Sequence, residues 1–281
     1  MLRLSARGYG QFRRILVQHP DAKLPERGSM LGRMVRERRH RALLLYLLLL
    51  TCWPWLEKNR EPLAASVWIR ALTAPGAQTW TPSTLSRAWN DLEEFGLIEE
   101  RQRKRRRTLV VPRREDGAEP YDAPGGRRSR EHLYFTLPDA FWTDQIFAQL
   151  SLPGLAMLLI IAKETTGKKR EMYLPLHMAP AWYGISSKTA QNGLNNLREH
   201  KLLHERDERE PAPLSPTGWR TKRYYSLTGA FGAEARAALQ KKASTERSAR
   251  AAAVDDSTRT PAEPGGDHGE EVRSDAPTPE P

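Results

Sequence analysis

Residues 81–107 read TPSTLSRAWNDLEEFGLIEERQRKRRR and contain the pattern that decides the fold. Thr81 is a favourable residue for the N-cap of a helix, and Pro82 suits a first helical turn. Apolar residues then recur at helical spacing, at Leu85, Trp89 and Leu92. The stretch therefore predicts an amphipathic helix that buries one side.

A basic β-hairpin is predicted directly after this helix. Phe95-Gly96 is a helix-ending pair, and Leu97-Ile98 begins an apolar strand. Six of the seven residues from Arg101 to Arg107 are Lys or Arg. A helix with one polar side, followed at once by a cationic hairpin, suits a surface that meets duplex DNA.

The candidate DNA-contacting residues of this region lie on the polar side of the helix and in the hairpin. Arg pairs well with guanine and Asn with adenine, whereas basic hairpin residues neutralise phosphates. The candidates are Ser83, Thr84, Ser86, Arg87 and Asn90 on the helix, and Arg101, Arg103, Lys104, Arg105, Arg106 and Arg107 in the hairpin. The alternative is a merely solvated polar surface, which any amphipathic helix has; the basic hairpin favours DNA.

Composition also favours a polyanionic partner. The 281 residues have a formal net charge of +11. Residues 251–281 hold eight acidic and two basic residues, a net of −6, which leaves +17 on residues 1–250. Such an imbalance favours nucleic acid over a membrane surface. An Arg-rich composition inherited from a GC-rich genome is the competing explanation.

Several classes of protein are disfavoured. The single cysteine, Cys52, excludes a disulfide framework and a Cys-based zinc cluster. The apolar run 42–56 is too short to span a bilayer, so we expect a buried helix. Residues 1–14 are basic and lack an apolar block, so we expect no secretory signal and a cytoplasmic location. No catalytic constellation is recognisable, and we expect neither an enzyme, nor a cofactor, nor a metal.

The second half of the chain repeats the first. Placing Thr84 over Thr189, an offset of 105, also aligns Ala88 with Gly193, Trp89 with Leu194, Asn90 with Asn195, Leu92 with Leu197, Leu97 with Leu202 and Arg101 with Arg206. Residues 130–141 match 220–231 at an offset of 90, which predicts that the first hairpin is fifteen residues longer than the second. Lys201 stands where the first copy has its helix-ending Gly96.

The second copy supplies a second set of candidates. Its predicted helix, capped by Ser186 or Ser187, has several neutral amides on one side. Asn is a poor helix former, whereas side-chain amides pair well with base edges. The candidates are Ser187, Lys188, Gln191, Asn192 and Asn195 on the helix, with Arg220, Lys222 and Arg223 in the second hairpin. A small residue at the shared position of Ala88 and Gly193 predicts a close helix crossing.

The order helix, helix, helix, strand, loop, strand, together with the residues just quoted, resembles the winged-helix superfamily over residues 39–232. Tandem copies look like the replication initiators of plasmids and phages. The resemblance implies a mainly α protein with small antiparallel β wings (α+β) and two tandem winged helix-turn-helix domains. We expect a basic arm at 1–38, winged-helix domains at 39–142 and 143–232, and at 233–281 a short helix (233–242) followed by a disordered acidic tail. A mobile loop is expected at 114–129.

The resemblance implies sequence-specific binding of double-stranded DNA, most simply at a replication origin. A transcriptional regulator is the first alternative, and a protein-binding subunit of a larger assembly is the second. Double-stranded DNA is the expected partner, with a second copy of the chain or the replication or transcription machinery as further candidates.

Overall fold

A computed structural model describes residues 7–59, 62–76, 78–99, 101–104, 107–125, 129–216 and 218–258. These residues form an α+β protein in which helices predominate and the sheets are small and antiparallel. Contacts divide the chain into a first unit, residues 1–243, and a second, residues 244–281. All helices and strands before the last helix lie in the first unit.

The first repeat contains three helices and a three-stranded sheet. Its helices are α2 (His40–Asn59), α3 (Ala65–Leu72) and α4 (Pro82–Glu94). Its strands are β2 (Leu63–Ala64), β3 (Gln102–Lys104) and β4 (Arg107–Leu109), paired in the order β2-β4-β3. The sequence pattern predicted α4 correctly, and the short strand β2 precedes α3.

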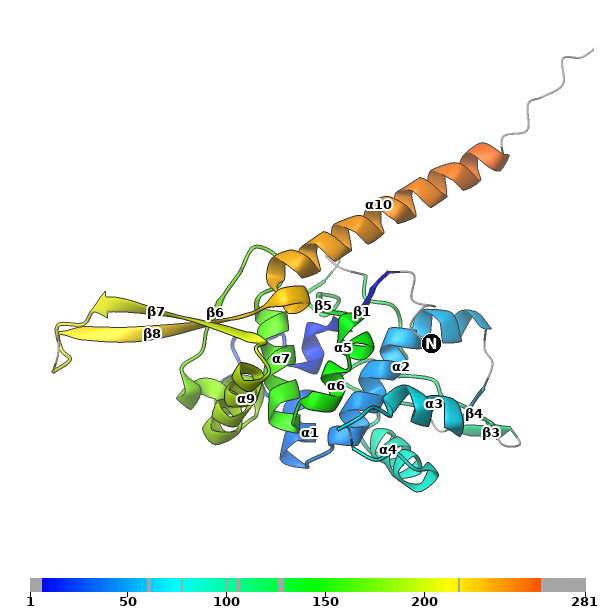
Figure 1. Ribbon diagram of the computed structural model, residues 1–281, viewed down its shortest axis with the longest axis horizontal. Coiled ribbons are helices and arrows are strands. Elements are labelled where there is room, and N and C mark those ends of the chain that lie inside the picture. The colour runs from blue at the N-terminus through cyan, green and yellow to red at the C-terminus, as the bar shows by residue number, and fades with distance from the viewer. Residues whose placement is uncertain are drawn as a thin grey trace, which may run out of the picture. The chain divides into compact units, whose positions relative to one another are not determined.

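The second repeat has the same order of elements and the same sheet order. Its helices are α7 (Leu152–Glu164), α8 (Ala179–Tyr183), which follows the 3-10 turn η3 (Leu176–Met178), and α9 (Ser187–Glu199). Its strands are β6 (Met172–Tyr173), β7 (Leu203–Pro211) and β8 (Trp219–Leu227), in the order β6-β8-β7. Figure 1 shows both sets, with α4 and α9 on the same, lower side of the first unit.

The remaining elements fill the space around the repeats. They are β1 (Tyr9–Arg13), the 3-10 turn η2 (Arg14–Leu16), α1 (Met30–Arg36), β5 (Tyr134–Pro138), α5 (Ala140–Thr143), α6 (Ile146–Gln149), η4 (Gly229–Phe231) and α10 (Ala233–Thr258). Helix α1, with Ser29 as its N-cap, lies within the segment expected to be a basic arm. The basic first segment therefore packs into the fold.

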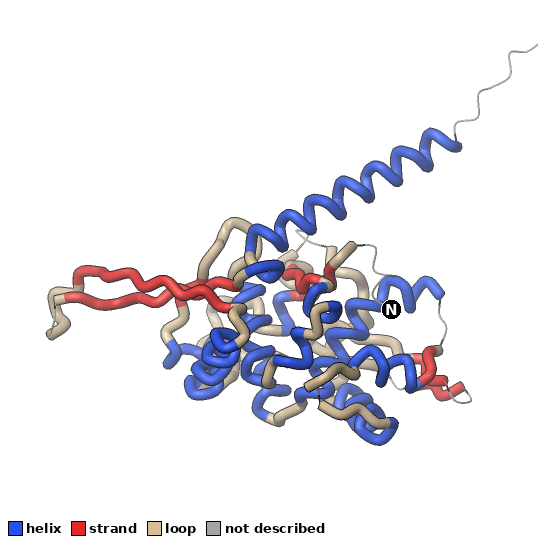
Figure 2. Tube along the Cα trace, viewed as in Figure 1, coloured by secondary structure: helices blue, strands red, loops and turns tan. Residues whose placement is uncertain are grey.

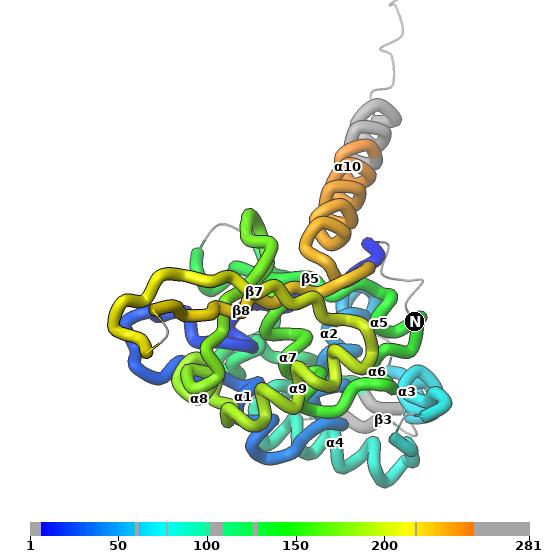
Figure 3. Tube along the Cα trace, turned by 60° about the vertical axis from the view of Figure 1, so that its left-hand side comes forward, coloured from blue at the N-terminus to red at the C-terminus, as the bar shows by residue number. Residues whose placement is uncertain are grey.

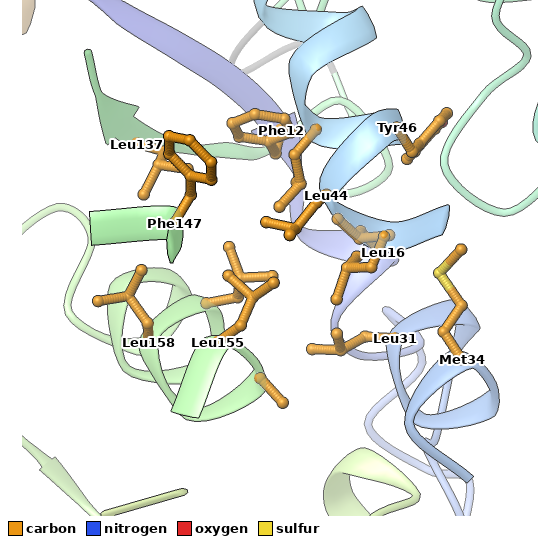
Figure 4. Close-up of a cluster of buried hydrophobic side chains, with 14 of the residues drawn as sticks. Phe12, Leu16, Leu31, Met34, Leu44, Tyr46, Leu137, Phe147, Leu155 and Leu158 are labelled. Atoms are coloured by element: carbon orange, nitrogen blue, oxygen red, sulfur yellow. The ribbon is translucent and has the colours of Figure 1, made fainter. Parts of the chain in front are cut away.

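One continuous hydrophobic core joins the two repeats. Figure 4 shows Leu44 of α2 and Leu155 of α7 in the same cluster of buried side chains as Leu16, Phe12 and Leu31. Leu16, Leu31 and Leu155 are completely buried. The apolar run 42–56 lies in α2, and most of its side chains are buried, which confirms the expectation of a core helix. Among the described residues, no helix combines the length and the apolar character needed to cross a membrane.

The strand at 134–138 does not belong to the first hairpin, contrary to the prediction from the second offset. β5 pairs antiparallel with β1, from Tyr9 opposite Pro138 to Arg13 opposite Tyr134. The second strand of the first hairpin is β4, so this hairpin is shorter than the second one. The local likeness of 130–141 to 220–231 persists only as a strand followed by a short helical turn with a buried Phe141 or Phe231.

The loop expected to be mobile at 114–129 is fixed over much of its described length. Glu115 is completely buried and accepts hydrogen bonds from the backbone N–H of Arg13 (2.8 Å) and from its guanidinium (2.9 Å). Arg13 also pairs with Asp122. The buried guanidinium requires carboxylate partners, and this requirement orders the loop. Residues 126–128 lie outside the described residues.

The final helix is longer than predicted. α10 runs from Ala233 to Thr258, whereas a helix to residue 242 and then a disordered tail were expected. Its first part is held in the first unit by Arg236, which is buried and donates to the carbonyl oxygens of Phe231 (2.8 Å) and Ala162 (2.9 Å). The expected disorder of residues 259–281 concerns positions outside the described residues.

Candidate nucleic-acid interface

Helices α4 and α9 begin with equivalent caps. The hydroxyl of Thr81 accepts from the backbone N–H of Thr84 at 3.2 Å, and the hydroxyl of Ser186 accepts from that of Thr189 at 3.0 Å. The two caps are 105 residues apart, as the sequence offset requires, and each helix has 13 residues. Ser186, and not Ser187, is therefore the cap, which places Ser187 in the first turn.

The ends of the two helices are also equivalent, although one lacks glycine. Gly96 and Lys201 both have left-handed backbones, with φ of 69° and 56°. The next N–H in each case bonds back into the helix, from Leu97 to the Leu92 carbonyl and from Leu202 to the Leu197 carbonyl, both at 2.9 Å. A residue with a Cβ pays roughly 1–2 kcal/mol for this conformation. Lys201 thus adopts the glycine geometry at an energetic cost.

The side of each helix that faces the core is tightly packed. In α4, Trp89 meets Trp68 of α3 edge to face, with ring centroids 5.2 Å apart. In α9, a Cβ added to Gly193 would lie 2.3 Å from the carbonyl oxygen of Pro153 in α7. This close crossing was predicted from the small residue, and it fixes which side of α9 faces outward.

The outward side of α4 is only partly available for contacts. Ser83, Arg87 and Asn90 are exposed, and Ser86 is half-buried. The hydroxyl of Thr84 belongs to the capping box with Thr81. Asn90 accepts a hydrogen bond from Arg101. The helix therefore presents Arg87 as its long cationic side chain, flanked by the shorter Ser83 and Asn90.

The outward side of α9 presents one cation and one amide. Lys188 and Asn192 are exposed, whereas Ser187, Gln191 and Asn195 are half-buried. Gln191 donates to the side chain of Asn195 at 2.9 Å, and Arg198 donates to the same oxygen at 2.8 Å. Asn195 is thus engaged within the helix, and Asn192 is the amide of this set best placed for a ligand.

The first hairpin is anchored to α4 at its first residue, Arg101, and basic residues follow in the sequence. Arg101 bonds to Glu93 of α4 at 2.7 Å, and its side chain is 9% exposed, so it ties the hairpin to the helix. Arg105 and Arg106 lie outside the described residues, and of Arg103, Lys104 and Arg107 only the backbone is described, in β3 and β4. Pairing begins before the regular strands, at the bridge between Ile98 and Pro112.

The second hairpin is longer, and acidic residues accompany its basic ones. Arg223 pairs with Asp207 at 2.7 Å, and both Arg220 and Lys222 pair with Glu210, at 3.1 and 2.5 Å. The hydrogen bond from Lys222 is the main cause that lowers the pKa of Glu210. The three candidate cations of this hairpin therefore already have anionic partners on the neighbouring strand.

Figure 2 shows the two hairpins as red ribbons at opposite ends of the first unit, the long β7–β8 on the left and the short β3–β4 on the right. In Figure 3, after a turn of 60°, the β7–β8 hairpin still extends to the left and α4 remains at the bottom of the first unit. The arrangement places two capped helices on one side of the unit, with a ribbon extending outward from each.

The sequence analysis missed a group of basic residues next to α4. Arg38, Arg39 and Arg41 lie beside Arg87, where α1 ends and α2 begins. The run RERRHR at 36–41 was the available signal, but the predicted boundary between the basic arm (1–38) and the first domain (39–142) divides it. Its proximity to α4 depends on the turn between α1 and α2, which no local pattern encodes.

No group of three or more His, Cys, Asp or Glu side chains that could hold a metal ion occurs within the described ranges. Comparison of the chain with protein-family models, with curated proteins and with solved structures yields no match. The functional interpretation therefore depends on the geometry given above.

Proposed function

We propose that this chain binds double-stranded DNA as a tandem winged-helix protein, with α4 and α9 entering the major groove. The observation that supports the proposal best is the duplication itself. Two segments have the order helix, strand, helix, helix, strand, strand, with the first strand next to the third. This order is that of a winged helix, and its third helix is the element that reads base edges in that fold.

Charge supports the same partner. The exposed Arg87 on α4 and the exposed Lys188 on α9 put a cation on the outward side of each helix. The first hairpin adds six cations within Arg101–Arg107, a density that is unfavourable unless anions are close. Phosphates of a duplex supply such anions, and their neutralisation makes affinity strongly dependent on salt.

Two DNA-binding units in one chain could occupy two half-sites without a dimer. Successive major grooves on one side of a duplex are about 34–36 Å apart. This property agrees best with an origin-binding replication initiator of a plasmid or phage. A transcriptional regulator uses the same contacts. The two roles differ in where the sites lie, as repeated copies near an origin or as one operator at a promoter.

Selection of bound sites from a pool of random duplexes tests the proposal. The wild-type chain should enrich a defined sequence with two half-sites. Arg87→Ala and Asn192→Ala should each lower the preference for that sequence by about 1–3 kcal/mol while leaving binding to random duplex largely intact. Arg247→Ala, which removes an exposed cation from α10, is the matched control.

Enrichment of no sequence, together with duplex binding that salt does not weaken, would contradict the proposal. That result would favour a protein partner instead. The second hairpin is the surface that such a partner would use, because its charges are paired and Leu214 at its turn is fully exposed.

A further inference from the structure

A depression of about 530 Å³ lies beside α4, at the junction of α1 and α2. Three segments meet there: the turn from α1 into α2, the segment before α4, and the outward side of α4. The residues that line it are Arg38, Arg39, His40, Arg41, Gln78, Thr84, Arg87, Ala88, Asn90 and Asp91. We refer to this feature as the arginine depression.

The positive charge of the arginine depression is largely uncompensated. Arg39 pairs with Asp91 at 3.1 Å, which uses the carboxylate of the lining. No described carboxylate forms an ion pair with Arg38, Arg41 or Arg87. Arg41 makes only a long hydrogen bond, 3.4 Å, to the carbonyl oxygen of Thr79. The guanidinium groups of Arg38, Arg41 and Arg87 therefore line the depression without a carboxylate partner among the described residues.

Buried N–H groups in the same place also lack acceptors. Gln78 donates to Nδ1 of His40 at 2.7 Å, which leaves the proton of the neutral ring on Nε2. This Nε2, together with Nε of Arg41 and Nε of Arg39, is buried without a hydrogen-bond partner in the part of the chain that the structure describes. Buried donors are normally satisfied, so three orphans on the lining of one depression indicate a missing acceptor.

Arg38 occupies a backbone position that favours glycine. It ends α1 with φ of 58°, while the N–H of Arg39 bonds back to the Met34 carbonyl at 2.9 Å. Glycine would adopt this turn without strain. An arginine at this position instead adds a cation to the depression, at the expense of the stability of the turn.

The first turn of α2 increases the positive potential further. The turn contains no acidic residue, and the aligned peptide dipoles place partial positive charge at the same end. Basic residues at this end of a helix are unfavourable unless an anion is near. A tetrahedral oxyanion with several acceptor oxygens would compensate the charges of these guanidinium groups.

We propose that the arginine depression binds a phosphate group of the DNA backbone, on the strand next to the groove that α4 enters. The inference rests on the proposed DNA binding and extends it to Arg38 and Arg41. A phosphate held here would fix the position of α4 along the groove without reading sequence, since backbone contacts set register and base contacts set preference. Arg87, at the border between depression and groove, can serve either contact.

Arg38→Gly tests the inference because it removes a cation and relieves backbone strain at the same time. We expect a melting temperature at or above that of the wild type, together with about tenfold weaker binding to every duplex. Between about 50 and 200 mM salt, the slope of log affinity against log salt should fall by about 0.9 for the one lost contact. Arg41→Gln should weaken duplex binding in the same direction.

Lys201→Gly is the matched control. It makes the same change of charge at a residue with the same left-handed backbone, and Lys201 does not line the depression. Its melting temperature should also rise, while the duplex affinity and the salt slope stay those of the wild type. The comparison separates loss of a phosphate contact from loss of one positive charge anywhere on the surface.

The outcomes distinguish the two proposals. If wild-type chain binds duplex but Arg38→Gly and Arg41→Gln bind it equally well with an unchanged slope, the phosphate site is wrong and DNA binding stands. If the wild type shows no salt-dependent duplex binding, the proposed function fails, and the phosphate site with it. Inorganic phosphate is the third probe. It could raise the melting temperature of the wild type but not of the two variants, while the variants bind duplex as well as the wild type does. In that case the depression binds free phosphate, and the proposed contact with DNA is wrong.

Discussion

At the scale of single residues, His40 is a neutral side chain placed among arginines. Burial, and secondarily the charge of Arg41, lowers its pKa to about 4. The unfolded chain should have the ordinary histidine value of 6.5. The folded protein therefore binds fewer protons than the unfolded chain between these two values, so acid should weaken the fold through this residue.

The sign of this effect gives a pH prediction. Stability contributed by neutral His40 is fully present above about pH 6.5 and is lost as the pH falls toward 4, by no more than about 3 kcal/mol. Urea unfolding at a series of pH values between 4 and 7 measures this loss. His40→Gln should flatten the dependence, and His204→Gln, at an exposed position on β7, should not. Equal slopes for wild type and His40→Gln would show that this histidine does not titrate as described.

At the scale of elements, the two hairpins have the same place in their repeats but different electrostatics. The paired strands β3 and β4 contain basic residues and no acidic one in their sequence, whereas the basic residues of β8 face the acids of β7, as Asp207 faces Arg223 and Glu210 faces Arg220. Cations that already have partners gain less from phosphate, because the existing ion pair must be broken first. DNA affinity should therefore depend on the first hairpin far more than on the second.

Replacing charged side chains of each hairpin by neutral amides tests this difference. Arg103→Gln with Lys104→Gln should weaken binding to all duplexes and lower the salt slope by up to about 2, at about 0.9 for each phosphate released. Asp207→Asn with Arg223→Gln removes a matched pair from the second hairpin and should leave the slope unchanged. Salt titrations of duplex binding measure both. Equal losses in the two double variants would contradict the assignment of phosphate contact to the first hairpin.

At the scale of the whole molecule, the two repeats are joined by one core. Leu16 is completely buried and belongs to the same core cluster as Leu44 of α2 and Leu155 of α7 (Figure 4). A residue shared in this way couples the repeats energetically, because a cavity at its site removes contacts from both. The two candidate reading helices therefore pack against the same hydrophobic core. We expect this packing, and not a flexible linker, to fix the distance between them on DNA.

Hydrogen exchange tests the coupling. Leu16→Ala should destabilise the first unit by about 2–5 kcal/mol, the usual range for removing a buried leucine. The most protected amides of α4 and α9 should lose protection together and by the same free energy. Leu214→Ala, at a fully exposed position, should change neither. Loss of protection in only one of the two helices would indicate repeats that open independently.

Both candidate reading helices could be predicted from local sequence. The apolar spacing of Leu85, Trp89 and Leu92 predicted α4, and the offset of 105 placed α9, whereas the choice of Ser186 as its cap and the left-handed backbone of Lys201 came from the structure. The helical spacings are encoded within a turn or two of helix, so a short stretch contains the full physical cause. The polar candidates on both helices followed from the same periodicity.

Which charges remain available and which strands pair could be learned only from the folded arrangement. β5 joins β1 instead of the first hairpin, Glu115 is buried on Arg13, and Arg38 and Arg41 lie beside Arg87. Each of these outcomes depends on partners that are many residues apart, and a pattern of single residues cannot tell a paired cation from a free one. Pairing over such distances is settled by which arrangement buries the apolar core while satisfying the buried charges.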